Sequence, residues 1–212
     1  MRPVFRSVLL LAVFGSATVF ADESADIAHL QTRWAEVNYQ LPEAEREKAF
    51  AELAAAAEGM RMAHPDSAPY LVWEGIIRST YAGAKGGFGA LGECKKARAL
   101  FEKSIALDPG AMAGSAYTSL GSLYYQVPGW PVGFGDDDKA RELLEKGLAV
   151  NPDGIDSNYF YGDYLMEEGD YPHALAAFEK ARQALPRPGR ESADAGRQAE
   201  IDAKIAEVRR KM

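Results

Sequence analysis

The small and apolar positions of the chain repeat three times with the same helical spacing. The segments 97–109, 140–152 and 174–186 read ARALFEKSIALDP, ARELLEKGLAVNP and ALAAFEKARQALP. Each has a small residue first, an apolar residue four positions later, a second small residue after three more, and a closing proline. Steps of four and three put these positions on one helix face, where small side chains let another helix approach closely, and the proline ends the helix. The positions are Ala97, Phe101 and Ser104; Ala140, Leu144 and Gly147; and Ala174, Phe178 and Ala181.

A second helical pattern precedes each of these three segments. It reads VWEGIIRSTYAG, AYTSLGSLYYQ and NYFYGDYLMEEG, with a glycine at positions 75, 121 and 162. Such pairs resemble the tetratricopeptide repeat, whose first helix carries Leu-Gly…Tyr and whose second carries Ala…Phe…Ala…Pro. Leu120-Gly121 with Tyr124 matches this pattern well. The resemblance covers residues 68–186 and implies paired helices stacked into a solenoid.

The flanking segments extend the same architecture. Residues 24–39 and 43–62 read as two helices of a degenerate first repeat. The charged segment 190–212 places Ile201, Ile205 and Val208 on one face, as a capping helix requires. No strand pattern competes. The sequence therefore predicts an all-α tetratricopeptide solenoid of about three recognisable repeats, with residues 22–212 forming one domain.

Residues 1–21 have the pattern of a secretory signal peptide. Arg2 and Arg6 precede an apolar run, and Val19-Phe20-Ala21 supplies small residues before a cleavage point after Ala21. Export to the periplasm is expected, with an uncleaved anchor as the alternative. No later stretch is apolar and long enough to span a membrane.

Two of the three helix pairs are longer than a regular repeat. Gly162 and Ala174 stand twelve residues apart, whereas Gly121 and Ala140 stand nineteen apart, and Gly75 and Ala97 stand twenty-two apart. We place both excesses in the turn of the hairpin, where each contains Gly-Phe-Gly, at 87–89 and 133–135. The sequence therefore predicts two related loops on one edge of the solenoid.

The aromatic residues of these loops need a packing partner. Leaving Trp130, Phe134 or Phe88 in water forgoes about 1.5–3 kcal/mol each. They are expected to pack either as a lid on the helices or as the wall of a binding surface. Pro128 and Pro131 stiffen the second loop.

The inner face of the solenoid follows from the three glycines. We expect it to hold Val72, Ile76 and Ser79; Thr118, Ser122 and Tyr125; and Tyr159, Asp163 and Met166. No lysine or arginine is among them, which favours an apolar or neutral ligand, although the tyrosines also suit packing between repeats. The candidate residues for ligand or partner binding are Trp130, Phe134, Phe88, Tyr125, Ile76, Tyr159 and Met166.

Composition and motifs favour binding over catalysis. The formal charge of −7 is unsuited to a nucleic-acid surface. The GFGALG run at 87–92 lacks the preceding strand of a dinucleotide site. Asp136, Asp137 and Asp138 suit helix capping better than calcium binding, as do Asp153 and Asp156.

Nucleophile and metal motifs are also missing from the sequence. The three histidines stand far apart, and no Gly-x-Ser-x-Gly or His-Glu-x-x-His occurs. Cys94 is the only cysteine, so no intrachain disulfide forms; it reads as a partly buried small residue, or else as a reactive thiol. We therefore expect no catalytic residue, no metal and no cofactor.

The segment 124–140 carries a more specific resemblance. Its Tyr-x-x-Val-Pro-Gly-Trp-Pro loop, followed by Gly-Asp and the Ala…Lys helix behind a signal peptide, resembles the T-component family associated with TRAP solute transporters. The resemblance implies a periplasmic binding or adaptor protein with a hydrophobic cavity or pore, oligomeric in some members. No cysteine follows the signal peptide, so a lipid anchor is not implied.

Three functional hypotheses follow. The protein is a carrier that encloses a hydrophobic small molecule, an adaptor that docks a periplasmic solute-binding protein, or a scaffold in an envelope complex without a small-molecule ligand. A closed apolar cavity would favour the carrier, and an open groove with exposed aromatic residues would favour the adaptor.

Overall fold

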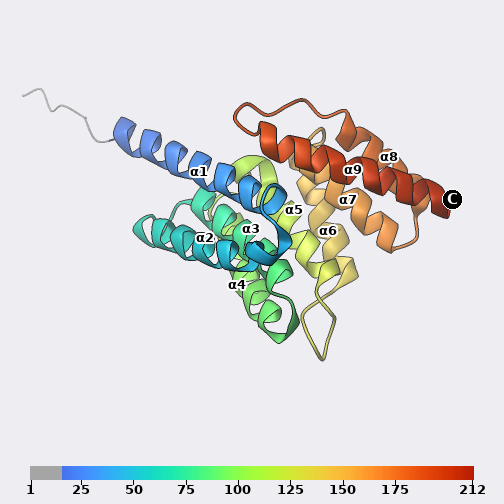
Figure 1. The fold of residues 1–212 in the computed structure, drawn as a ribbon, viewed down its shortest axis with the longest axis horizontal. Coiled ribbons are helices and arrows are strands. Elements are labelled where there is room, and N and C mark those ends of the chain that lie inside the picture. Colours follow the sequence, from blue (N-terminus) through green and yellow to red (C-terminus); the bar gives the residue numbers. More distant parts are fainter. Residues whose placement is uncertain (1–15) are drawn as a thin grey trace, which may run out of the picture.

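The computed structural model describes residues 16–212, except for the side chains of residues 16–22 and of Phe88. Most of the predicted signal peptide lies outside this range, and the expected cleavage point falls within the first described helix. The fold is an all-α solenoid, as the sequence predicts (Figure 1). The helices are α1 (Ser16–Tyr39), α2 (Glu43–Ala63), α3 (Ala68–Lys85), α4 (Gly87–Leu107), α5 (Ala111–Gln126), α6 (Asp137–Val150), α7 (Ile155–Glu167), α8 (Tyr171–Arg182) and α9 (Glu191–Lys211).

Each repeat is held together where a glycine of its first helix meets a large side chain of its second. A Cβ atom at Gly75 would lie 2.5 Å from Cε1 of Phe101, and one at Gly121 would lie 2.8 Å from Cγ of Leu144. Gly162 faces Phe178 in the third repeat. The tetratricopeptide pairing and its register are therefore confirmed. The nine small and apolar positions of the second helices are all buried.

The odd-numbered helices close into a ring. Contacts run from α1 to α3, α5, α7 and α9 in order, and α9 also contacts α1. Each even-numbered helix packs against its two odd-numbered neighbours outside this ring. Figure 1 shows the blue α1 and the red α9 along the same side of the molecule. The two ends of the solenoid therefore meet, which the repeat pattern does not predict.

Helix α9 serves as the expected cap and makes this closure. Ile201, Ile205 and Val208 are buried in the main core. At the junction with α1, Gly196 lies directly against the ring of Tyr39, with no space for a Cβ atom. The side-chain amide of Gln40 donates a hydrogen bond to the Ser192 hydroxyl at 2.8 Å.

The prediction of the first loop, around Gly87-Phe88-Gly89, is wrong. Helix α3 continues to Lys85 and α4 begins at Gly87, so only Gly86, with φ of 63°, separates them. The extra residues lengthen both helices, and Gly87-Phe88-Gly89 forms the first turn of α4. The physical reason is that residues 81–91 contain no proline, so nothing prevents helix formation there.

The second predicted loop exists, at residues 127–136. Its neck is closed by hydrogen bonds from the Asp136 amide to the Tyr124 carbonyl at 2.9 Å and from the Gly135 amide to the Pro128 carbonyl at 3.0 Å. Asp136 caps α6 as expected, because its carboxylate accepts a hydrogen bond from the Lys139 amide at 3.1 Å. The two prolines keep this insertion out of a helix.

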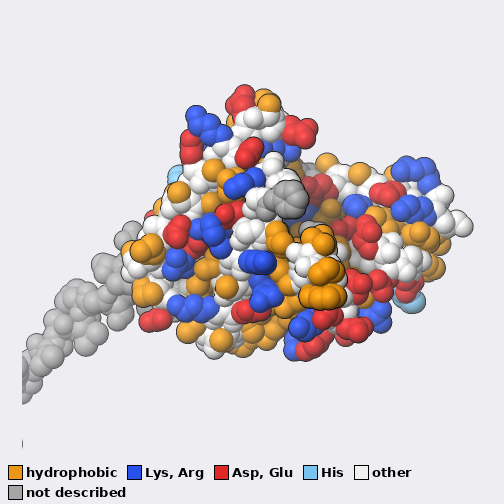
Figure 2. Space-filling model, turned by 90° about the horizontal axis from the view of Figure 1, so that it is seen from below, with side chains coloured by type: hydrophobic (Ala, Val, Ile, Leu, Met, Phe, Trp, Pro, Cys, Tyr) orange, Lys and Arg blue, Asp and Glu red, His pale blue; other side chains and the backbone are white. Residues whose placement is uncertain are grey.

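The aromatic residues of this loop behave differently from each other. Phe134 packs as expected, edge-on to Tyr124 at 5.5 Å and beneath the Arg98 guanidinium at 4.8 Å. Trp130 does not pack, because 89% of its surface is exposed. The expectation that the Trp130 side chain packs against another part of the protein is therefore wrong. Figure 2 views the face on which the loop projects, where hydrophobic side chains gather among charged ones.

A buried ionic cluster joins α2, α3 and α4. The Arg78 guanidinium donates to Glu74 at 2.6 Å, to Glu93 at 2.7 Å and to Glu58 at 2.9 Å. Burial alone would raise the pKa of Glu93, but hydrogen bonds from Lys96 and Arg78 outweigh it and lower that pKa. The cluster holds the lengthened helices α3 and α4 together. The repeat pattern does not predict this cluster.

Replacing Gly75 by alanine tests the repeat packing. The new methyl group would collide with the Phe101 ring, so Gly75→Ala should lower the free energy of unfolding by about 1–3 kcal/mol. Gly83→Ala is the matched control, because Gly83 lies on the same helix with nothing within 4 Å. The control should raise stability by up to about 1 kcal/mol. Urea titrations of both variants measure the free energy of unfolding. Equal changes in the two variants would contradict the assigned packing.

Candidate binding cavity

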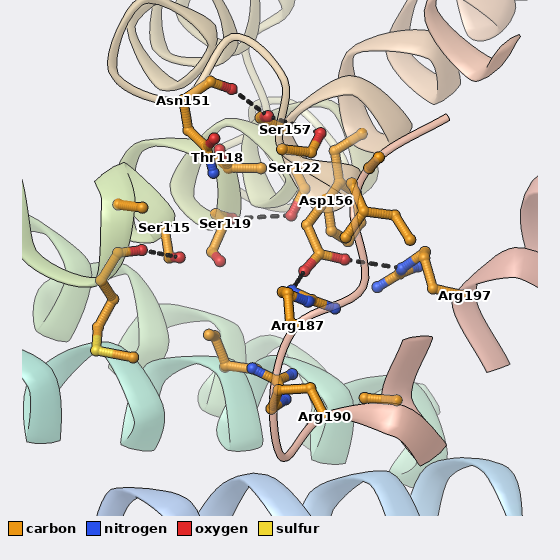
Figure 3. Close-up of a pocket in the computed structure, with 18 of the residues that line it drawn as sticks. Ser115, Thr118, Ser119, Ser122, Asn151, Asp156, Ser157, Arg187, Arg190 and Arg197 are labelled. Atoms are coloured by element: carbon orange, nitrogen blue, oxygen red, sulfur yellow. Dashed lines mark hydrogen bonds and ion pairs between the residues drawn. The ribbon is translucent and has the colours of Figure 1, made fainter. Parts of the chain in front are cut away.

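A central cavity of about 900 Å³ lies inside the ring of odd-numbered helices. Side chains of α1, α3, α5, α7, α8 and α9 line it, together with the segments before α7 and α9 (Figure 3). We call residues 183–197 the closing segment, because they complete the wall that the repeats leave open. The volume lies within the range of about 300–1,000 Å³ that is typical of ligand sites.

One wall is aromatic. The ring of Trp34 stands edge-on to Tyr39 at 5.7 Å and to Trp73 at 6.4 Å. The indole N–H of Trp34 donates to the Thr80 hydroxyl at 2.9 Å, which fixes its orientation. This cluster joins α1 to α3. Ile76 and Phe160 add further apolar surface to the cavity.

A second wall is rich in hydroxyl groups. Figure 3 shows Ser115, Ser119 and Ser122 along α5, facing the cavity. The hydroxyl of Ser115 donates to the Met112 carbonyl at 2.5 Å. Residues 112–114 adopt left-handed backbone, with φ of 50°, 54° and 73°. Met112 and its neighbour Ala113 are not glycine, so this turn at the cavity is strained.

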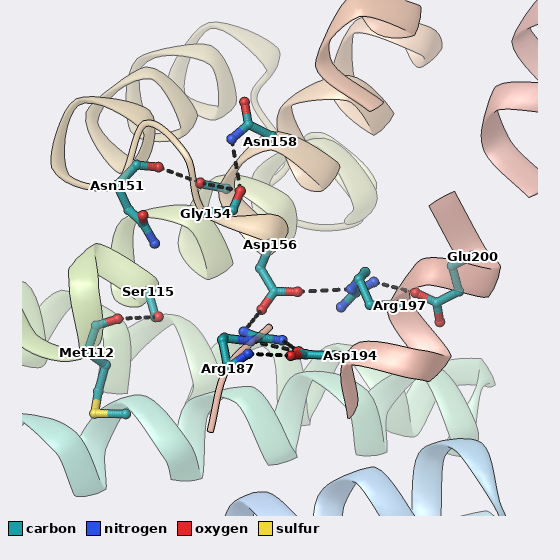
Figure 4. A network of polar contacts seen from close by, with 11 residues as sticks. Met112, Ser115, Asn151, Gly154, Asp156, Asn158, Arg187, Asp194, Arg197 and Glu200 are labelled. Carbon is teal, nitrogen blue, oxygen red and sulfur yellow. Dashed lines mark hydrogen bonds and ion pairs between the residues drawn. The ribbon is translucent and has the colours of Figure 1, made fainter. Parts of the chain in front are cut away.

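The third wall is cationic and centres on Asp156. Its two carboxylate oxygens accept hydrogen bonds from Arg187 at 2.7 Å and from Arg197 at 2.9 Å (Figure 4). Asp194 holds Arg187 from the side away from Asp156, and Glu200 holds Arg197. Burial alone would raise the pKa of Asp156, but the charges of Arg197 and Arg187 outweigh it and lower that pKa to about 2. Asp156 therefore ties α7 to the closing segment. It lies in the first turn of α7, where its charge complements the helix dipole, but the N-cap residue is Gly154.

Arg190 differs from the two arginines beside it. Within residues 16–212 its guanidinium has no ion pair, and its Nε is buried without a hydrogen-bond partner. The group lies over the Trp73 ring at 5.1 Å from the centroid. Figure 3 shows Arg190 beside α3, at the edge of the cavity.

The structure brings together part of the predicted inner face. Ile76, Ser79, Thr118 and Ser122 line the cavity. Val72 is fully buried in the core instead. The expectation of a groove without lysine or arginine is wrong, because the closing segment and Lys180 supply four cations that repeat positions do not reveal. These residues are Lys180, Arg187, Arg190 and Arg197.

Helix α9 covers the other predicted inner positions. Tyr125 donates to Asp163 at 2.8 Å, and Lys204 of α9 pairs with Asp163 at 2.7 Å. Tyr159 and Met166 are buried in the core. None of these residues lines the cavity, and their proposed role in binding stays a prediction.

The loop candidates lie apart from the cavity lining. Trp130 and Phe134 belong to the loop 127–136 and do not line the central cavity. The side chain of Phe88 lies outside the described residues. The predicted groove between two Gly-Phe-Gly loops is therefore replaced by a cavity inside the helix ring.

The arginines of the closing segment are not among the predicted site residues, because the repeat pattern predicts only a cap for the C-terminal segment. One signal was present: Arg190, Ala193 and Arg197 follow steps of three and four and so share a helix face. Its spacing is as regular as that of Ile201 and Ile205, which form the apolar face further along the helix. A cap needs no small or basic face of this kind.

Neither a metal-binding group nor a membrane-spanning helix emerges from the part of the chain that the structure describes. Residues 16–212 contain no cluster of three or more histidine, cysteine, aspartate or glutamate side chains placed to hold a metal ion. None of their helices is long and apolar enough to cross a membrane.

Asp156→Asn tests the clamp on the closing segment. The unfolded pKa of aspartate is about 3.9 and the folded pKa is about 2, so the stabilisation is present above pH 4 and is lost as pH falls through 2. At pH 7 the variant should be less stable by about 2 kcal/mol, since hydrogen bonds to charged groups are lost. The difference from the parent should shrink as pH falls from about 4 to about 2.

Asp153→Asn is the control for this experiment. Asp153 is 86% exposed and pairs only with Lys180 at 3.2 Å, so its replacement should change stability by less than about 0.5 kcal/mol. Urea melts across the pH range provide the measurement. A gap between parent and Asp156→Asn that does not depend on pH would show that the carboxylate is not held by the arginines.

Comparison with known proteins gives a structural likeness only. No family model matches the chain, and no curated protein matches it in sequence. Among solved structures, "Crystal structure of MamA" is 20% identical with a TM-score of 0.45, covering 82% of this chain and 95% of that one. "Crystal structure of MamA protein" is 18% identical with a TM-score of 0.44, covering 88% of this chain and 92% of that one.

Proposed function

We propose that the protein is a non-enzymatic binding module that holds a guest molecule in the central cavity. The observation that carries this proposal is the cavity itself, about 900 Å³ in volume and formed only because α9 closes the helix ring onto α1. A solenoid that served only as a stack of repeats would have no need for this closure.

The chemistry of the lining supports a binding role. Ligand sites combine apolar surface with a few polar groups that fix the orientation of the ligand. Here an aromatic wall on α1 and α3 faces hydroxyl groups on α5 and arginines on the closing segment. The left-handed turn at residues 112–114 adds support, since strained backbone clusters at ligand sites.

We also propose that the protein meets its guest outside the cytoplasm. The basic, apolar and small-residue regions of residues 1–21 support export, with cleavage after Ala21. A solute-binding protein as partner remains an implication of the resemblance to the T-component family.

A second candidate function is a protein–protein scaffold that uses the loop 127–136. The observation that favours it is the exposure of Trp130 at 89% and of Val132 at 66% on a loop whose neck is closed by hydrogen bonds. Tryptophan on a preformed loop is a common anchor in interfaces, because little entropy is lost when it binds.

Native mass spectrometry separates the two functions. Protein purified from its own cells should carry a bound guest of defined mass. Ser119→Trp should lose that guest, because the indole projects from α5 into the space that the guest occupies, while the Ser119 hydroxyl makes no hydrogen bond within residues 16–212 that would be lost. Trp130→Ala should keep the guest.

The opposite pattern would contradict the cavity function. If Trp130→Ala loses a bound protein subunit while Ser119→Trp keeps every bound mass, the loop is the functional surface. Circular dichroism should show unchanged helix content in both variants. Trp130→Ala should also leave stability within about 0.5 kcal/mol of the parent, because its side chain is exposed.

A further inference from the structure

Two residues in the wall of the cavity carry buried hydrogen-bond donors without partners in the described chain. They are the Nε of Arg190 and the indole Nε1 of Trp73, whereas the hydroxyl of Tyr39, a third residue of the lining, lies beside the Glu200 carboxylate. Trp73 is only 3% exposed. The Arg190 guanidinium lies over the Trp73 ring, and Tyr39 and Trp73 both contact Trp34. The donors therefore belong to one connected cluster.

We propose that this cluster binds the anionic head of an amphipathic organic acid, a carboxylate carried on an apolar body. Arg190 receives the carboxylate, and the apolar body lies along the cavity against Trp34 and Ile76. This inference rests on the proposed function and names the chemical class of its guest.

The distribution of charge singles out Arg190. Arg187 and Arg197 are both held by Asp156, and each has a second carboxylate partner, so their charges are balanced within the protein. Arg190 makes no ion pair in the described chain. An anion entering the cavity therefore meets one arginine whose hydrogen bonds are available.

The pKa of Arg190 agrees with this geometry. Burial lowers that pKa, and the neighbouring charge of Arg187 lowers it further, whereas Asp156 and Asp194 oppose the shift from a distance. A bound carboxylate would relieve the cost of keeping this charge buried. The indole of Trp73 keeps the guanidinium in place before the anion arrives, because a cation is attracted to the face of the ring.

The chemistry of the donors selects an acceptor. A carboxylate accepts hydrogen bonds only, which matches the guanidinium of Arg190, a group that only donates, and charge-assisted bonds from arginine are the strongest of their kind. An alcohol of the same length would offer one weak acceptor and no charge. The aromatic wall and Phe160 supply the apolar surface that a simple inorganic anion would leave uncovered.

Tryptophan fluorescence tests the proposal with decanoate as the probe and decan-1-ol as its neutral control. The chain has three tryptophans, so a Trp130→Phe background leaves only the two that line the cavity. Decanoate, kept below its micelle concentration, should change the emission and bind at least about tenfold more tightly than decan-1-ol. Raising the salt concentration should weaken decanoate binding only.

Arg190→Met should reduce decanoate affinity at least about tenfold and leave decan-1-ol binding unchanged. Arg182→Met is the matched control, since Arg182 is exposed and should not affect either probe. Arg190→Gln serves if the methionine variant does not fold, and circular dichroism reports folding. Trp73→Phe keeps an aromatic ring beneath Arg190 and removes the indole N–H donor. Calorimetry should therefore show weaker binding of decanoate but not of decan-1-ol.

The outcomes distinguish this inference from the proposed function. Equal affinity for both probes, or an Arg190→Met variant that binds decanoate normally, overturns anion recognition and leaves a binding cavity. No binding of either probe, with a native guest that Ser119→Trp removes, overturns the organic-acid class alone. No probe binding and no native guest overturns both.

Discussion

The contact between α9 and α1 is the constraint on which the rest of the structure depends. Tetratricopeptide helices by themselves form an open solenoid, because each repeat contacts only its neighbours. Here Gly196 brings α9 against the Tyr39 ring, and Gln40 bonds Ser192 across the same junction. This long-range contact turns the open inner face into a central cavity.

Electrostatics holds the closing segment in place. Asp156 accepts from Arg187 and Arg197 at once, so one carboxylate on α7 positions two arginines of the closing segment. Paired charges at partly buried positions add little net stability, since desolvation offsets much of their attraction. Here the pairs hold Arg187 and Arg197 against one carboxylate of α7. The clamp therefore fixes where Arg190 stands, although Arg190 takes no part in it.

The repeat positions predict the fold well because their physical cause is local. Gly75 and Phe101 are matched by helix packing within one hairpin, which sequence spacing records directly. The same reasoning placed the cap of Ile201, Ile205 and Val208 correctly. Insertions were harder to predict, since a Gly-Phe-Gly motif occurs both in the α4 helix and in the 127–136 loop. Proline was the better signal, because only the true loop contains it.

The cavity was harder to predict, since it depends on contacts distant in sequence. Four inner-face positions were placed correctly from the glycine register, among them Ile76 and Thr118. The arginines were missed because the spacing of Arg190, Ala193 and Arg197 does not by itself show that α9 folds back over the inner face. The burial of Tyr159, and the exposure of Trp130, likewise depend on tertiary neighbours and not on spacing.

The most direct test of this account is whether the two ends of the solenoid meet in solution. Cysteines at positions 40 and 192, in a Cys94→Ala background, can be treated with a short bismaleimide crosslinker and analysed by peptide mass spectrometry. A closed ring should give rapid crosslinking within one chain, and far slower reaction for a control pair at positions 40 and 138. Crosslinking at 40 and 192 no faster than in the control pair would contradict ring closure, and with it the cavity.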